Sequence, residues 1–289
     1  MTDNSSETKT YHGVIVPMVT PLTMNGELDE PALRRVIDHL VTGGVQGIFV
    51  LGTTGEGPST PHEIRSRLVS VTIEHAAGRA QVYAGIPNTV VSDSVAAAKE
   101  YLRRGAAAVV ATLPYYYKLT DDEQFRYFSW LVERIPGPLL LYDIPAAVNM
   151  SNDLGVIEHL RAFPNVVGIK DSTGDPQRLA AFLESYADDP GFSVLVGSTA
   201  LSSAGLRDGA DGFVPSGANL NPALCARLYA AACKGDWTLM NHLQSELNAL
   251  QAEFGVPGYI GSGIARLKKL MAQRGLCSPA VFWPLHMEE

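Results

Sequence analysis

The chain repeats one pattern eight times, in which a short apolar run is followed by a segment with helical periodicity. The runs are rich in β-branched residues and show almost no polar/apolar alternation, which is typical of parallel strands covered on both faces. Most of their starts lie about 27 to 34 residues apart, the length of one strand–helix unit. The predicted strands are Val14–Val16, Gly47–Leu51, Gln81–Ala84, Ala108–Thr112, Pro138–Tyr142, Val166–Lys170, Ser193–Val196 and Gly212–Val214.

Eight such units in succession predict an α/β fold, a closed (β/α)8 TIM barrel over residues 11–220. An open, doubly wound sheet is the alternative, because regular alternation alone does not prove closure. A polar tail over residues 1–10 precedes the barrel, and a C-terminal helical region over residues 221–289 follows it. The predicted helices are Glu30–Thr42, Pro61–Ala77, Ser92–Arg104, Asp121–Arg134, Pro176–Tyr186, a short helix near Leu201–Arg207, Asn221–Cys233, Trp237–Phe254 and Ile260–Arg274.

Composition limits the partners and the location of such a protein. The formal net charge is −8, which argues against nucleic acid. The first ten residues lack the apolar core of a secretion signal, and no apolar stretch approaches the roughly 18 to 20 residues of a membrane span. Cys225, Cys233 and Cys277 form no CxxC pair and are expected to be free, buried thiols. A cytoplasmic location is therefore expected.

The sequence contains no recognisable cofactor or metal motif. Its seven histidines are scattered without HxH or HxxxH spacing, so we expect no metal site. GxGxxG and GK[ST] are absent, as is the GxSxG of serine hydrolases. We therefore expect chemistry that side chains alone can perform on a small molecule.

Lys170 is the most informative residue, because catalytic groups of a barrel project from the carboxyl ends of its strands. It ends an apolar run, whereas the other six lysines occupy polar or amphipathic segments. An amine in an apolar barrel mouth is desolvated, which favours the neutral form that attacks carbonyls. The alternative is a lysine paired with a carboxylate such as Asp171, although adjacent strand residues point to opposite faces. The residues alone leave both interpretations open.

Tyr142 ends the neighbouring predicted strand. Parallel neighbours lie about 4.8 Å apart, so its hydroxyl can approach Lys170 and relay protons. A core tyrosine with a satisfied hydroxyl is an equally good interpretation. Tyr115 and Tyr117, in the run of three tyrosines after the fourth strand, are expected to be packing residues.

The loop over residues 52–57 combines glycines, two hydroxyls and backbone N–H groups. Such a nest suits a carboxylate or phosphate oxygen. A lone loop of this kind is a weak signal, and structural roles remain open. Glu56 could act as a general base, but a hydrogen bond that holds the loop is the preferred interpretation.

Together these segments resemble the dihydrodipicolinate synthase/N-acetylneuraminate lyase superfamily over nearly the whole chain. The resemblance is carried by VPMVTPL from Val16, GTTGE at 52–56, PYY at 114–116, YDIP at 142–145 and GIKDS at 168–172. It implies a class I pyruvate aldolase or lyase that needs no cofactor and assembles as a homotetramer, a dimer of dimers.

The resemblance also implies roles for single residues. Lys170 would form the Schiff base with pyruvate, and Tyr142 would transfer protons over it. Thr53 and Thr54 would hold the carboxylate, and Thr53 would join a relay that Tyr116 completes from a neighbouring subunit. Further substrate-binding positions would be Gly55, Ser172, Gly197, Ser198 and the backbone carbonyl of Val214.

Three departures from the family's pattern affect the second substrate. Synthases carry an arginine five residues after the catalytic tyrosine, where this chain has Ala147. Neuraminate lyases carry acidic residues after the glycine that matches Gly197, where this chain has residues Ser-Thr-Ala. The common asparagine after the tyrosine is Asp143, for which the sequence suggests no role.

We therefore expect cleavage or condensation of a 2-oxo-4-hydroxy acid into pyruvate and an aldehyde. The chain looks most like 4-hydroxy-2-oxoglutarate or 2-keto-3-deoxy sugar acid aldolases. Dihydrodipicolinate synthase, N-acetylneuraminate lyase and a sugar acid dehydratase are alternatives. A keto-acid-binding sensor without turnover is the alternative outside enzymes.

Overall fold

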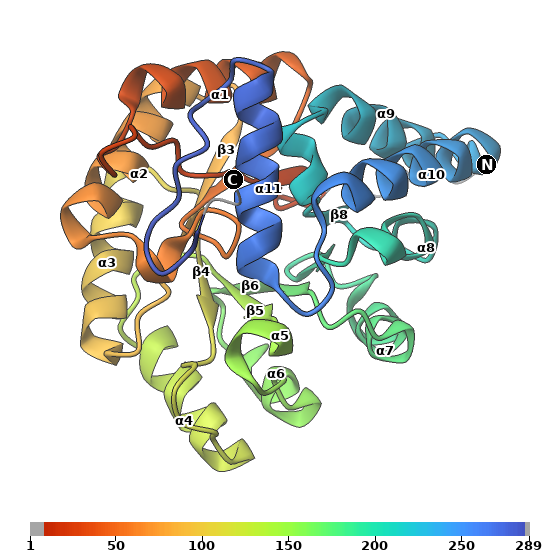
Figure 1. Cartoon of the computed structure of the whole chain (residues 1–289). Helices are drawn as coiled ribbons and strands as arrows, with labels where there is room; N and C mark the ends of the chain where they lie inside the picture. Colours follow the sequence, from red (N-terminus) through yellow and green to blue (C-terminus); the bar gives the residue numbers. More distant parts are fainter. Residues whose placement is uncertain (1–8, 287–289) are drawn as a thin grey trace.

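A computed structural model describes residues 9–286, in which eight parallel strands close into one barrel in chain order (Figure 1). Strand β1 pairs with β8 through Gly13 and Gly212, so the sheet has no free edge. The predicted closed barrel is confirmed, and the open sheet is excluded. The strands are β1 (Gly13–Pro17), β2 (Gly47–Val50), β3 (Gln81–Gly85), β4 (Ala108–Thr112), β5 (Leu139–Asp143), β6 (Val166–Asp171), β7 (Ser193–Val196) and β8 (Gly212–Phe213).

Helices surround the barrel, and most of them begin and end within two residues of the predicted bounds. They are α1 (Glu30–Thr42), α2 (His62–Ala76), α3 (Val91–Arg104), α4 (Asp121–Val132), α7 (Pro176–Tyr186), α8 (Ser202–Arg207), α9 (Pro222–Cys233), α10 (Trp237–Phe254) and α11 (Ile260–Gln273). Each outer helix buries one face; in α1 the buried residues recur with helical spacing, from Ala32 and Leu33 to Leu40. The Asp29 carboxylate caps α1 by accepting from Ala32 N at 3.0 Å.

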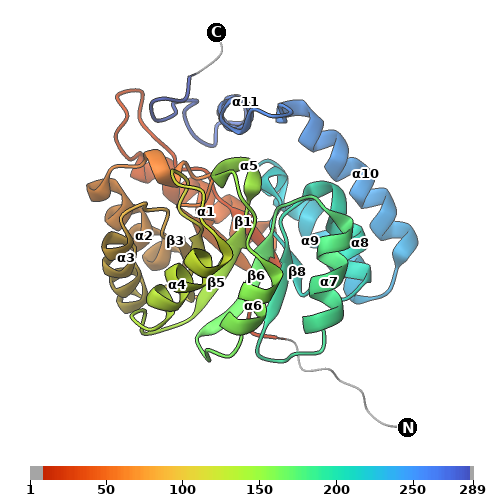
Figure 2. The ribbon, with the colours of Figure 1, turned by 90° about the horizontal axis from the view of Figure 1, so that it is seen from below.

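Two short helices after β5 were not predicted. Helix α5 (Pro145–Val148) begins with a proline, and α6 (Leu154–Leu160) begins after Asp153, whose side chain accepts from Val156 N. Four and seven residues are too short to show a helical hydrophobic period, so the pattern that revealed the longer helices does not reveal these. Helix α5 lies at the end of the barrel where the carboxyl ends of the strands meet (Figure 2).

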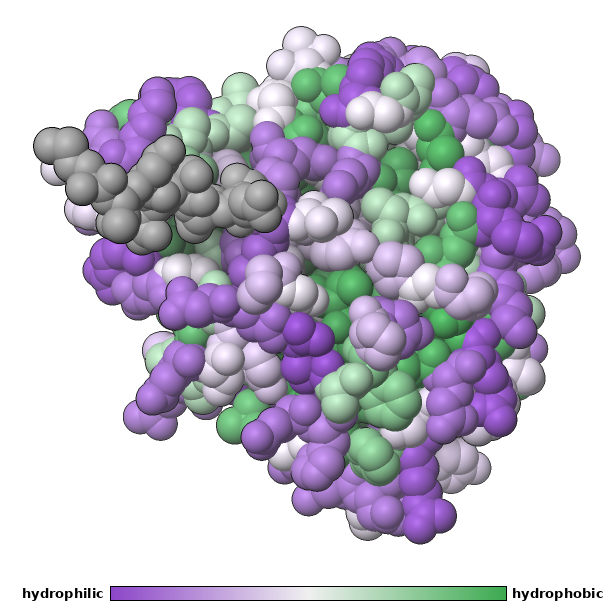
Figure 3. Space-filling view, turned by 180° about the vertical axis from the view of Figure 1, so that it is seen from behind, coloured by the Kyte–Doolittle hydropathy of each residue, from purple (hydrophilic) through white to green (hydrophobic). Residues whose placement is uncertain are grey.

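The two ends of the barrel differ. Helices α10 and α11 lie on the same side as α5, whereas the chain enters β1 from the opposite end (Figure 2). At that opposite end Lys9 Nζ donates to Tyr186 O, Phe192 O and Asp211 Oδ2 and thereby ties the start of the chain to β7 and β8. Hydrophilic residues form most of the rim of this face, with hydrophobic residues between them (Figure 3).

The structure also tests the expectations for the cysteines and for membrane-spanning helices. All three cysteines are free, but Cys233 is exposed, so its predicted burial is wrong; Cys225 and Cys277 are buried as expected. None of the helices between residues 9 and 286 combines the length and hydropathy of a membrane span.

Helix α11 is fixed to the barrel mouth by a buried ion pair between Lys268 and Glu56. Lys268 Nζ lies 2.8 Å from Glu56 Oε1, and both side chains are fully buried. The same ammonium donates to Thr20 O at 2.9 Å, and Glu56 Oε2 accepts from Phe282 N at 2.6 Å. Burial lowers the pKa of Lys268, while the Glu56 carboxylate partly restores it. Glu56 thus joins the β2 loop, α11 and the C-terminal segment, which is the structural role preferred from the sequence.

We expect Lys268→Met to lower the free energy of unfolding by about 3 kcal/mol or more, because it leaves the Glu56 carboxylate buried without its cation. Urea unfolding followed by circular dichroism measures the loss. Lys269→Met, one residue further along the exposed side of α11, is the matched control and should change stability much less. Equal losses in the two variants would contradict a special role for the buried pair.

Candidate active site

Lys170 and Tyr142 are direct neighbours across strands β5 and β6. The register pairs Leu139 with Val166 but Leu140 with Gly168, so Val167 has no partner on β5. This bulge shifts β6 by one residue and places Lys170 opposite Tyr142. The predicted proximity of the two side chains is therefore confirmed.

Both side chains point into the mouth of the barrel. Lys170 is 6% exposed, and its Nζ lies 3.9 Å from the ring centroid of Tyr142. The ring of Phe49, on β2, lies 5.2 Å from the same nitrogen and packs edge-on against Tyr142. Among residues 9–286 no carboxylate forms an ion pair with Lys170, and Asp171 instead accepts from Thr173 N at 3.0 Å. The amine therefore sits between aromatic faces, as expected for a desolvated nucleophile.

The Tyr142 hydroxyl has three side-chain partners in the site. Burial raises its pKa, but the charge of Lys170 and hydrogen bonds with Lys170, Thr53 and Ser172 lower it, so the pKa lies below the usual value of a tyrosine. A phenol that ionises more readily can accept and return a proton closer to neutral pH. The ring is buried and its hydroxyl has partners, which also fits the core-tyrosine interpretation, so proton transfer by Tyr142 stays a prediction.

The loop after β2 is tightly wound. Leu51 adopts a left-handed backbone with φ 58°, and its carbonyl oxygen would lie 2.0 Å from a Cβ added at Gly57 and 2.3 Å from one at Gly85. Glycine is thus required at both positions. Thr20 Oγ1 donates to Gly55 O at 2.6 Å and fixes the loop against the segment after β1.

This winding presents the two predicted threonines to the barrel mouth. Thr53 hydrogen-bonds to Tyr142, and Thr54 lies across the mouth near Ser216, on the side of α10. Within residues 9–286 no backbone carbonyl accepts from the amides of Thr53, Thr54 or Gly55. These N–H groups are consequently available to a carboxylate.

Ser172 and Gly197 meet beside Tyr142. Ser172 follows Lys170 by two residues and faces the same way, which lets it hydrogen-bond to Tyr142. A Cβ at Gly197 would lie 1.9 Å from Ser172 Oγ, so only glycine fits there. Ser198 follows at the start of the turn into α8, and the buried Val214 donates its N–H to Val196 O. The direction of the Val214 carbonyl stays a prediction.

The three tyrosines after β4 project from the chain. Tyr116 is 77% exposed and Tyr117 is 73% exposed, with their rings edge-on at 5.0 Å. The packing role expected of Tyr117 is therefore wrong within this chain, and Tyr115 is half-exposed. Tyr116 does not reach Tyr142 inside one chain, so its predicted role in a relay depends on a neighbouring subunit.

Asp143 lies on the outer face of β5, behind the site, and pairs with Arg178 of α7. Arg178 Nη2 donates to Asp143 Oδ2 at 2.6 Å and also to Asn152 O. Burial raises the pKa of Asp143 to about 6, although Arg178 opposes the rise; Asp171, opposite on β6, adds to it. The sequence did not predict this pair, and one charged residue at the first turn of α7 is too weak a signal to find it.

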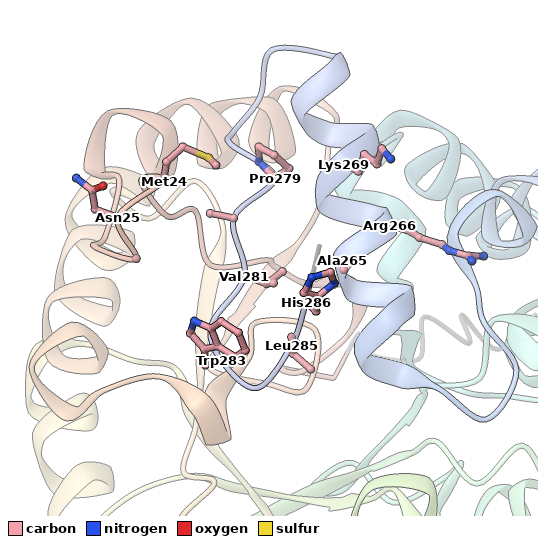
Figure 4. A pocket seen from close by; sticks show the side chains of 12 residues that line it. Met24, Asn25, Ala265, Arg266, Lys269, Pro279, Val281, Trp283, Leu285 and His286 are labelled. Atoms are coloured by element: carbon pink, nitrogen blue, oxygen red, sulfur yellow. The ribbon is translucent and has the colours of Figure 1, made fainter. Parts of the chain in front are cut away.

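Two of the cavities border the mouth of the barrel, and another lies apart from it. A cavity of about 320 Å³ is bordered by Phe49, Thr53 and Tyr142, and one of about 500 Å³ by Thr54 and Ser216. The third, of about 540 Å³, lies between α11, the C-terminal segment and the β1–α1 loop (Figure 4). Trp283 and Leu285 face it from the C-terminal segment and Met24 from the loop, and none of the predicted site residues lines it.

Comparisons with known proteins show which sequences and folds this chain resembles. The family model "Dihydrodipicolinate synthetase family" matches residues 10–287. A 4-hydroxy-tetrahydrodipicolinate synthase of Aromatoleum aromaticum is 32% identical over 94% of this chain and 91% of its own length. A dihydrodipicolinate synthase of Bacteroides thetaiotaomicron has a TM-score of 0.91 at 34% identity, covering 97% and 95% of the two chains. A chloride-inhibited dihydrodipicolinate synthase from Acinetobacter baumannii, complexed with pyruvate, has a TM-score of 0.90 at 26% identity, covering 97% and 94%.

We expect Asp143→Asn to remove a pH dependence of stability. The folded-state pKa of about 6 lies above the ordinary 3.8, so this carboxyl stabilises the fold fully at low pH and loses that contribution as pH rises through 6. Relative to the variant, the wild-type free energy of unfolding should fall by about 1 kcal/mol between pH 5 and pH 7. Urea unfolding at both pH values measures this difference.

Asp122→Asn is the control, because it removes an exposed carboxylate paired with Arg126 on α4. Its stability should run parallel to that of the wild type. Parallel curves for Asp143→Asn and the wild type would show that Asp143 does not titrate in this window.

Proposed function

This chain belongs to the Dihydrodipicolinate synthetase family, and we propose that it cleaves a 2-oxo-4-hydroxy acid reversibly into pyruvate and an aldehyde. Members of the family are enzymes of the class I aldolase and lyase type that form a Schiff base with pyruvate. The observation that carries the proposal is the buried Lys170 amine lying 3.9 Å from the ring of Tyr142. The substrate that supplies the aldehyde is the open part of the function.

The first half of the reaction activates the substrate. The neutral amine of Lys170 attacks C2 of the 2-oxo acid to form a carbinolamine. Tyr142 donates the proton with which the carbinolamine hydroxyl leaves as water, so an iminium ion forms beside ionised Tyr142. The free amides of Thr53 and Thr54 would hold the carboxylate during this step. Phe49 and the Tyr142 ring lie against the amine and shield it from solvent.

The second half breaks the C3–C4 bond. Ionised Tyr142 takes the proton of the C4 hydroxyl, the bond electrons move into the iminium, and the aldehyde leaves an enamine on Lys170. Tyr142 then returns its proton to C3, and water hydrolyses the resulting iminium to release pyruvate and the amine. Thr53 and Ser172 support the role of Tyr142 by hydrogen-bonding to the phenol.

Synthesis of 4-hydroxy-tetrahydrodipicolinate is the second candidate, because curated relatives about 30% identical carry that name. Ala147 weakens it, since synthases place an arginine at the matching position to hold the carboxylate of the second substrate. Cleavage to glyoxylate stays a prediction, as in the 4-hydroxy-2-oxoglutarate aldolases that the Gly-Ser pair at 197–198 and the KDS segment resemble. Cleavage to a sugar-derived aldehyde also stays a prediction, as in the 2-keto-3-deoxy sugar acid aldolases that the PYYYK run resembles.

We also propose that the chain acts as a homotetramer. The exposure of Tyr116 and Tyr117 supports a contact with a second copy. In that assembly Tyr116 would complete a proton relay with Tyr142 and Thr53.

Borohydride reduction in the presence of pyruvate should add one reduced pyruvate unit to Lys170, detected by intact mass and peptide mapping. Lys170→Ala should abolish the adduct. Lys118→Ala removes an exposed lysine that follows β4 and should leave trapping unchanged. A wild-type protein without adduct, or an adduct that persists in Lys170→Ala, would overturn the proposal.

Tyr142→Phe should reduce kcat by about 10²- to 10⁴-fold, because it removes the group that moves the proton. The fold should persist, since the ring remains against Phe49. Tyr83→Phe is the matched control: it removes a buried barrel phenol that hydrogen-bonds to Gln81 at the far end of the strands. Steady-state retro-aldol rates measure both variants, and equal rates would exclude Tyr142 from proton transfer.

A further inference from the structure

We propose that the cavity beside Tyr142 receives the aldehyde half of the substrate, and that this half carries an uncharged apolar group such as an aryl ring. We name this cavity the apolar pocket; its apolar wall is formed by Phe49, Leu51, Ile86, Val110, Ile144 and Val148. The inference rests on the proposed function, because it extends the substrate that Lys170 would bind.

The position of the apolar pocket fits the reacting atoms. Phe49 and Tyr142 line it, and the same two rings lie 5.2 Å and 3.9 Å from Lys170 Nζ. A substrate joined to that nitrogen through C2 therefore extends C4 and its substituent along Tyr142 into the pocket. The C4 hydroxyl then lies on the side of the Tyr142 phenol, as the cleavage step requires.

The size of the pocket fits a ring better than a single small group. Its volume of about 320 Å³ falls at the lower end of small-ligand sites, roughly 300–1,000 Å³. Burying an aryl group against such walls is favourable, because apolar area leaves water.

The lining offers nothing to a charged aldehyde. Among the described residues that line it, none is Lys, Arg, His, Asp or Glu; the polar groups are the hydroxyls of Thr53, Ser59, Thr112, Tyr115 and Tyr142. A carboxylate transferred there would lose its hydration without gaining a cation, which is costly.

Arg65 contacts the loop that borders the apolar pocket, and its guanidinium already has three acceptors. Arg65 donates Nε to Thr60 O at 2.7 Å, Nη1 to Asn88 Oδ1 and Nη2 to Pro58 O at 3.5 Å. Its guanidinium therefore fixes the loop after β2, and Arg65 is not one of the lining residues. Turning it inward would leave these three acceptors without their donor.

Helix α5 contributes to the uncharged, apolar lining of the pocket. It is four residues long and starts directly after Ile144. Ala146 and Ala147 are both exposed, but only Ala147, together with Val148, lines the pocket. A long cationic side chain at position 147 would place a guanidinium at the rim. The methyl group of Ala147 leaves that rim apolar.

The cavity near Thr54 is the rival place for a polar aldehyde. Its polar side chains already bind one another: Gln251 Oε1 accepts from Thr199 Oγ1 at 3.3 Å and from Ser216 Oγ at 3.2 Å. Asn248 Oδ1 accepts from Gln244 Nε2 at 2.8 Å. A polyhydroxylated aldehyde would have to displace these bonds, so the structure favours the apolar pocket.

The test measures kcat/KM for condensation of pyruvate with benzaldehyde, glyoxylate and D-glyceraldehyde, with the 4-hydroxy-2-oxo acid products quantified by chromatography. We expect benzaldehyde to exceed each of the others by at least about tenfold. Ala147→Arg should lower the benzaldehyde-to-glyoxylate ratio by at least about tenfold. Ala146→Arg, the matched control on the same helix, should leave the ratio unchanged.

Preference for glyoxylate would overturn the inference, and preference for D-glyceraldehyde would place the aldehyde near Thr54 instead. An equal ratio change in Ala146→Arg would also overturn it, because the effect would then be one of surface charge. Borohydride trapping of pyruvate on Lys170 is run on every variant. Trapping without a benzaldehyde preference refutes this inference alone, whereas absence of trapping in the wild type refutes the proposed function.

Discussion

The site depends on a one-residue bulge in strand β6. If β5 and β6 continued the register that pairs Leu139 with Val166, Tyr142 would stand opposite Ile169. Because Val167 has no partner on β5, Lys170 takes that place. Gly168 permits the irregularity, since a Cβ there would lie 2.3 Å from Ser193 O of β7. A backbone feature held by three strands thus fixes the distance between amine and phenol before any substrate binds.

Side chains alternate along β5 and β6, so the site residues and two carboxylates lie on opposite faces of the sheet. Tyr142 and Lys170 face the barrel mouth, while their neighbours Asp143 and Asp171 face the helices. Arg178 of α7 pairs with Asp143, and its charge also opposes the burial that raises the pKa of Asp171. The amine consequently has aromatic faces and the Tyr142 hydroxyl around it instead of a counter-ion, which supports its proposed role as the nucleophile.

The sequence was sufficient for the parts of the fold with a strong period. Strand β4 and helices α1 and α10 have the predicted bounds, and closure followed from eight repeated units. Contacts between distant segments were not predictable in the same way. Lys268 was placed in an amphipathic segment, yet Ile264, Leu267 and Met271 show that it lies on the buried face of α11. Its partner Glu56 is more than 200 residues away, and no local pattern reports such a pair.

In the proposed reaction, catalysis and aldehyde selection depend on different elements of the barrel. Lys170 and Tyr142 belong to strands whose register involves the whole sheet, so an insertion or deletion there would disturb the closure on which stability depends. Ala147 and Val148 belong to a four-residue helix that borders the apolar pocket and ends in a left-handed Asn149. Substitutions on α5 can therefore alter which aldehyde fits while the amine and the phenol keep their positions. The departure from the synthase arginine, Ala147, is an exposed residue of this short helix.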